Sequence, residues 1–141
     1  MKKMNNKGFS LIELIIVIAI MAVLVAIIAP NLTKYLGKSK SQTDKTNLDE
    51  IKKQFKNAIS DAATSEITDV AGTYTVTGGS ASLDTSKPHG TGATNFEGVV
   101  SNALDSDTNT KSKVDSSKTS IEVVVSGSDS AGYTLTASFT Q

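Results

Sequence analysis

The sequence predicts an α+β protein in which a long N-terminal α-helix packs on a small antiparallel β-sheet head. Three observations support this prediction. Residues Leu11–Ala29 form an apolar run that contains one charge, Glu13. Apolar residues then recur at helical spacing as far as Ala62. After residue 71, three short segments alternate between apolar and polar residues in the manner of β-strands.

The apolar run has the length of a membrane-spanning helix, because about twenty residues cross the hydrocarbon of a bilayer. It follows a leader that carries Lys2, Lys3 and Lys7. The run is longer than the apolar core of a secretory signal peptide, and it ends at Pro30 without a small-residue cleavage pattern, which argues against ordinary secretion and release. A carboxylate within such a segment is costly, so Glu13 needs a partner or a place at the headgroup boundary.

The stretch Lys7-Gly8-Phe9-Ser10-Leu11-Ile12-Glu13 and the apolar run after it resemble the N-terminus of type IV prepilins and of the related pseudopilins of type II secretion. The resemblance implies that a prepilin peptidase cuts after Gly8 and methylates the new N-terminus, Phe9. Glu13 then becomes the fifth residue of the mature chain, where the family carries its assembly acid. Pro30 falls where the family commonly has a helix-kinking proline.

The resemblance also implies a domain organisation and a role. Residues 1–8 are expected to be the leader, 9–30 the transmembrane and filament-core helix, and 31–141 the globular head. The mature subunit is expected to stay in the cytoplasmic membrane and then to polymerise with copies of itself, through membrane assembly machinery, into a surface pilus for adhesion or twitching motility. A pseudopilin of a secretion or DNA-uptake apparatus is the alternative, and a bitopic protein with a small ligand-binding head is the third reading.

The implied role of Glu13 agrees with physical chemistry. Cleavage after Gly8 frees an amine at Phe9, and methylation does not abolish its positive charge. In a staggered bundle, Glu13 of one subunit can meet this amine of its neighbour. A charge pair in a low dielectric is favourable when made and costly when broken, so it also sets the register of the helices. The alternative is that Glu13 only occupies the headgroup boundary.

Beyond the membrane segment the sequence predicts that the helix continues to about Ala63, with an amphipathic upper half. The polar stretch Gly37–Asn47 interrupts the apolar stripe, and there we expect the helix to bend, to melt or to cross solvent. The residues of the stripe lie three or four apart: Leu32, Tyr35, Leu36, Leu48, Ile51, Phe55, Ala58, Ile59 and Ala62.

The rest of the head is predicted to be mostly β-structure. Thr73–Thr77 reads as a strand that ends in a Gly78-Gly79 turn, and Ala93–Leu104 as a short helix. Ile121–Val125 and Tyr133–Phe139 predict an antiparallel hairpin in which Val124 and Leu135 are the apolar centres, and the alternate residues Tyr133, Leu135, Ala137 and Phe139 face the helix. Ser80–Gly92 and Asp105–Ser120 are expected to be surface loops.

Composition argues against several other functions. The chain has 14 Lys, 14 Asp and Glu and no Arg, which does not resemble the basic footprint of a nucleic-acid-binding protein. With no Cys and only His89, no zinc cluster or nucleophile–histidine pair can be assembled, and His89 is expected to lie in a loop. Asp105–Asn109 has the oxygen spacing that opens a calcium loop, but Thr110 and Ser116 replace the required Gly and Glu. No catalytic residue, metal or cofactor is therefore expected.

Overall fold

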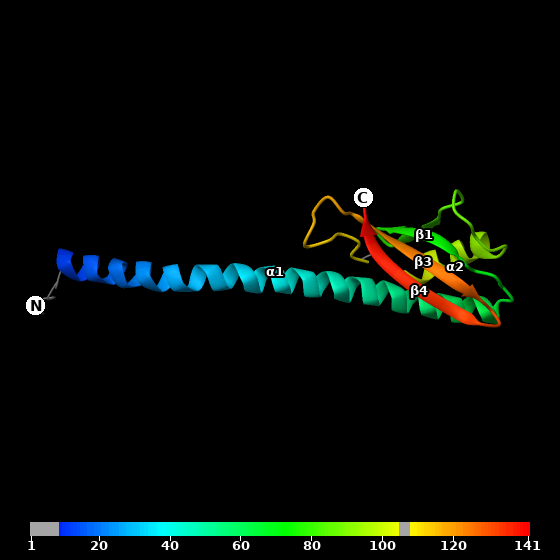
Figure 1. Cartoon of the computed structure of the whole chain (residues 1–141), viewed down its shortest axis with the longest axis horizontal. Coiled ribbons are helices and arrows are strands. Elements are labelled where there is room, and N and C mark those ends of the chain that lie inside the picture. The colour runs from blue at the N-terminus through cyan, green and yellow to red at the C-terminus, as the bar shows by residue number, and fades with distance from the viewer. Residues whose placement is uncertain (1–8, 105–107) are drawn as a thin grey trace, which may run out of the picture. The chain divides into compact units, whose positions relative to one another are not determined.

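The computed structural model describes residues 9–104 and 108–141. Helix α1 (Leu11–Thr64) is followed by strands β1 (Gly72–Thr77) and β2 (Ser80–Leu83), helix α2 (Ala93–Ala103), and strands β3 (Ser120–Ser128) and β4 (Gly132–Thr140) (Figure 1). The α+β class predicted from the sequence is confirmed. Gly8, the predicted cleavage position, and Asp105–Asp107, which open the calcium-like stretch, lie outside the described residues.

The chain divides into two compact units, and the boundary between Ser39 and Lys40 falls inside α1. In the first unit, the large apolar side chains from Phe9 to Leu36 are all at least 48% exposed. The predicted helix is confirmed, and it continues without interruption through Pro30 and through the polar stretch Gly37–Asn47.

The second unit contains one antiparallel sheet in the order β2-β1-β3-β4. The turn between β1 and β2 consists of Gly78 and Gly79, whose φ values are 54° and 82°. Two successive positive φ angles are required in the type I′ turn that suits a two-residue hairpin, and glycine adopts them without a Cβ clash. The predicted β3–β4 hairpin is confirmed, with Val125 opposite Leu135.

The core of this unit lies between the upper part of α1, one face of the sheet, and α2. Its centre is an edge-to-face cluster of Phe55, Tyr74 and Phe96, with ring centroids 5.5 to 6.3 Å apart. The stripe predicted for the upper part of α1 is confirmed, because Ile51, Phe55, Ala58 and Ala62 are at most 1% exposed. Tyr133, Leu135, Ala137 and Phe139 of β4 pack against this core, as predicted.

Two predictions about the sheet were wrong. Ser80–Leu83 is a strand and not a loop, because Ala81 and Leu83 lie opposite Val76 and Tyr74 of β1 and are buried with them. Val124 is not an apolar centre of the hairpin. It pairs with Thr136 on the outer face of the sheet and is only half-buried, whereas the buried residues of β3 are Ile121, Val123 and Val125.

The stretch before β3 also differs from the expected surface loop. Thr110 and Ser112 are 4% and 8% exposed, and Ser112 contacts Asp44 of α1, which is itself 8% exposed. Helix α1 therefore does not simply cross solvent at Gly37–Asn47, since one carboxylate of that stretch is buried against the loop.

Candidate functional site

The first turn of α1 is capped by the carboxylate of Glu13. The backbone N–H of Ser10 donates to Glu13 Oε2 at 2.9 Å, and the N–H of Leu14 donates to the carbonyl of Ser10 at 3.3 Å. Ser10 and Glu13 thus occupy the two ends of a capping-box sequence, in which an acid three residues into the helix reaches back to the cap. The helix macrodipole also favours a negative charge at this end.

This cap gives Glu13 a partner within its own chain, which the sequence interpretation did not include. The signal was available, because Ser-x-x-Glu before an apolar run is a recognised start of a helix. A carboxylate has about four acceptor sites, so one hydrogen bond from Ser10 does not exhaust Glu13. The capped carboxylate can still take a cation supplied from outside the chain.

Apart from Glu13, the surface of α1 from Leu11 to Ala29 is apolar on all sides. Phe9 is 89% exposed, and no residue from 9 to 40 is buried. A helix that is apolar all round belongs in a membrane or among other helices. Among the described residues, α1 is long and apolar enough to cross a membrane, judged by length and composition.

Pro30 lies inside α1 and has no N–H to donate to the preceding turn. Two neighbouring side chains supply hydrogen bonds at this point. Asn31 Nδ2 donates to the carbonyl of Ile27 at 3.4 Å, and Thr33 Oγ1 donates to the carbonyl of Pro30 at 3.0 Å. The first bond reaches a carbonyl of the turn before Pro30, the second reaches the carbonyl of Pro30 itself, and α1 continues through the proline.

The predicted site residues are thus distributed along one helix. Glu13 lies in its first turn, Phe9 lies two residues before its first residue, Leu11, and Pro30 follows the apolar run. His89 lies in a loop, as predicted, with Nδ1 2.9 Å from the carbonyl of Lys87. Within residues 9–104 and 108–141, no three His, Cys, Asp or Glu side chains come together as metal ligands. The start of this helix therefore offers an apolar surface that suits a membrane or neighbouring helices, together with one carboxylate, that of Glu13.

Comparison with known proteins agrees with this description. Residues 3–29 match the family model described as the prokaryotic N-terminal methylation motif. Over 44 residues the chain is 52% identical to "Type IV major pilin protein PilA" of Myxococcus xanthus, an alignment that covers 31% of this chain and 20% of that protein. Over 70 residues it is 39% identical to "Prepilin peptidase-dependent protein A" of Clostridium perfringens, which covers 48% of this chain and 50% of that protein.

The chain spans half or less of the length of these two relatives. No solved structure matches it. The predicted resemblance is confirmed: the chain carries the N-terminal methylation motif of prokaryotic prepilins and has homologues that are named as a type IV major pilin and as a prepilin peptidase-dependent protein.

Proposed function

We propose that this chain is a structural subunit, of the major-pilin kind, of a type IV pilus. The observation that carries the proposal is the apolar run Leu11–Ala29 of α1, which is exposed on every side and lies within the methylation motif at residues 3–29. Such a helix needs lipid before assembly and other helices after it. One kind of surface serves both states, because membrane storage and a filament core are both apolar environments.

Maturation is the first step of the proposed function. A prepilin peptidase removes residues 1–8 by cutting between Gly8 and Phe9, and Phe9 is then N-methylated. The cut precedes the apolar run, so the product keeps residues 9–30 as its anchor in the cytoplasmic membrane. Membrane assembly machinery then moves subunits from this store into a filament on the cell surface.

Assembly is the second step, and Glu13 directs it. One oxygen of Glu13 already accepts the N–H of Ser10. Its remaining acceptor capacity is available to the methylated amine of Phe9 on a neighbouring subunit, where the low dielectric between apolar helices strengthens the pair. We assign to Pro30 a bend of α1 that fits the helix among its neighbours in the filament core.

Residues 31–141 form the head in this proposal. All the residues of the hydrophobic core, from Ile51 to Val125, lie within this range. Expressed without the leader and the apolar run, the head is therefore expected to be soluble and to show both helix and strand by circular dichroism. An aggregated product without strand signal would contradict the proposed division of the chain.

Electron microscopy of cells with and without this gene product tests the proposed function. We expect long surface filaments, decorated along their length by antibodies against residues 40–141, and we expect them to disappear when the chain is deleted. If deletion leaves surface filaments intact but abolishes protein secretion or DNA uptake, the chain is a pseudopilin and the proposal of a pilus subunit fails.

A further inference from the structure

The two edges of the head's sheet differ in how their backbone groups are satisfied. At the β2 edge, α2 covers the strand: the N–H of Ala81 donates to Ser101 Oγ and the N–H of Leu83 donates to Glu97 Oε2, both at 3.2 Å. At the β4 edge, no side chain among the described residues bonds to a backbone group of Gly132–Thr140. This strand also has no charged residue and no proline, which are common protections of an edge strand.

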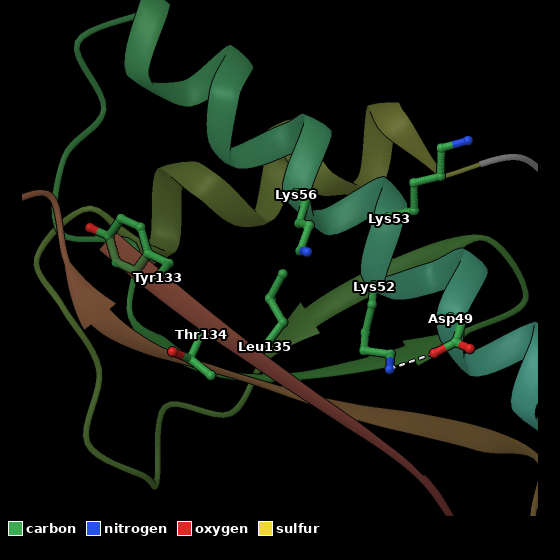
Figure 2. A pocket seen from close by; sticks show the side chains of 7 residues that line it. All are labelled: Asp49, Lys52, Lys53, Lys56, Tyr133, Thr134 and Leu135. Atoms are coloured by element: carbon green, nitrogen blue, oxygen red, sulfur yellow. Dashed lines mark ion pairs between the residues drawn. The ribbon is translucent and has the colours of Figure 1, made fainter. Parts of the chain in front are cut away.

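A groove of about 430 Å³ lies between this open edge and α1. Figure 2 shows Lys52 and Lys56 extending from α1 towards β4, while Lys53 points away. Lys52 is paired with Asp49 at 2.5 Å, and Lys56 forms no ion pair with any residue that the structure describes. The groove is lined by Asp49, Lys52, Lys53, Lys56, Tyr133, Thr134 and Leu135.

The chemistry of the groove favours an anionic hydrogen-bond acceptor. A lysine ammonium is a donor only, and an unpaired strand edge adds backbone N–H donors. A carboxylate is an acceptor only, so it satisfies both kinds of donor at once. The same head already uses this solution at its other edge, where the carboxylate of Glu97 accepts a strand N–H.

Glu66 carries a carboxylate that forms no ion pair with the residues of its own head that the structure describes. Helix α1 ends in a Schellman motif, in which the N–H of Ile67 donates to Ala62 and the N–H of Glu66 donates to Ala63. Glu66 occupies the position that usually belongs to glycine, with φ of 59°. Its negative charge also lies at the negative end of the helix macrodipole. It is exposed and makes no ion pair within the described residues.

We propose that the groove between α1 and β4 docks Glu66 of a second copy of this chain, an inference that rests on the proposed pilus function. The charges of the head are complementary for such a contact. Seven lysines lie between residues 34 and 56, and none lies between 57 and 86 or between 119 and 141. Because the groove and the carboxylate are different surfaces, the contact is head-to-tail, which is the kind of contact that builds rings or open filaments, and the proposed pilus requires the open form.

Cysteine cross-linking tests the contact directly, since the chain has no Cys of its own. In the full chain, Thr134→Cys places a thiol in the groove and Ser65→Cys places one beside Glu66, with all charges kept. Mild oxidation of filaments is expected to give a ladder of dimers, trimers and longer oligomers on a non-reducing gel. The matched control pairs Ser65→Cys with Lys111→Cys outside the groove and is expected to give no ladder. Intact filaments without a Thr134 and Ser65 ladder would overturn the inference.

Charge exchange tests the energetics of the same contact. Lys56→Glu alone and Glu66→Lys alone are each expected to lower filament yield about tenfold, because like charges then face each other. Combining them is expected to restore the yield, and Lys111→Glu is the control that should not change it. If Lys56→Glu lowers the yield but the combined variant does not restore it, the groove binds another anion, such as a phosphate polymer, and the inference fails.

Glu66→Gly separates docking from folding. Glycine relieves the positive φ and removes an unfavourable charge, so the denaturation midpoint of the head is expected to rise. Filament yield is nevertheless expected to fall, and an unchanged yield would overturn the inference. These results are distinguishable from failure of the proposed function, because in that case the wild-type chain would form no filaments.

Discussion

The hydroxyl of Ser112 donates to Asp44 Oδ2 at 2.6 Å and so joins α1 to a loop 68 residues further along the chain. The same carboxylate accepts the backbone N–H groups of Lys113 at 2.6 Å and Val114 at 3.2 Å. Ser112 Oγ in turn accepts the N–H groups of Val114 and Asp115. One buried carboxylate therefore organises the loop that leads into β3.

Replacing Asp44 with Asn is expected to destabilise the head by roughly 2 to 3 kcal/mol. Hydrogen bonds to a charged acceptor are lost, and the NH2 group of the asparagine would face N–H and O–H groups that are themselves donors. Denaturant unfolding of residues 31–141 measures the effect. Asp49→Asn is the control: its side chain is 71% exposed and its pair with Lys52 is at the surface, so we expect less than about 1 kcal/mol. Equal losses in the two variants would contradict the role given to Asp44.

The pH dependence of stability gives a second test of Asp44. Burial by itself raises the pKa of this carboxyl, but the hydrogen bonds from Lys113, Ser112 and Val114 outweigh burial and lower the pKa below its ordinary value of 3.8. Because the folded-state pKa is depressed, the stabilisation is fully present above 3.8 and is lost as pH falls through the lower, folded-state value. The free energy of unfolding should therefore fall more steeply below about pH 4 in the wild type than in Asp44→Asn. Parallel curves would contradict this.

The sequence predicted the elements whose signals are local. The apolar run, the helical stripe through Ile51 and Phe55, and the β3–β4 hairpin all follow from periodicity within a short window. The sequence interpretation missed β2, because Ala81 and Leu83 are too few to show alternation until β1 lies beside them. It placed Val124 in the core because three successive valines do not reveal which face of a strand is buried.

The candidate site was predictable to a different extent. The methylation motif spans residues 3–29 and so includes Phe9 and Glu13, while the roles of these two residues stay predictions. The burial of Asp44 was not predictable, because its partner Ser112 is 68 residues away. A carboxylate that lies among polar residues in a sequence is normally expected to be exposed to solvent. Glu66 was not noticed either, since the positive φ that makes it unusual is a property of the folded helix end.

The two faces of β3 can be compared with one kind of substitution. Val123 is fully buried and Val124 is only half-buried on the other face. We expect Val123→Ala to cost about 2 kcal/mol and Val124→Ala less than about 1 kcal/mol, because only the first leaves a cavity in the core. Denaturant unfolding of the head decides between them, and a larger loss for Val124→Ala would reverse the assigned face.

Two substitutions distinguish the contribution of the Glu13 charge to filament assembly from the contribution of its capping hydrogen bond. Glu13→Gln keeps an acceptor for the Ser10 N–H but removes the charge, whereas Glu13→Ala removes both. We expect both variants to insert in the membrane with a folded head and both to form fewer filaments than the wild type, as counted by electron microscopy. If Glu13→Gln assembles as well as the wild type, the cap and not the charge is what assembly requires.

The mass of the native protein tests the central claim most directly. Intact-mass and N-terminal peptide spectrometry of protein from its own cells should find a chain that has lost eight residues and begins at N-methylated Phe9, with the apolar run still attached. A chain that retains Met1, or one cut beyond Ala29 and released, would contradict the proposal that this protein matures as a prepilin and assembles through its N-terminal helix.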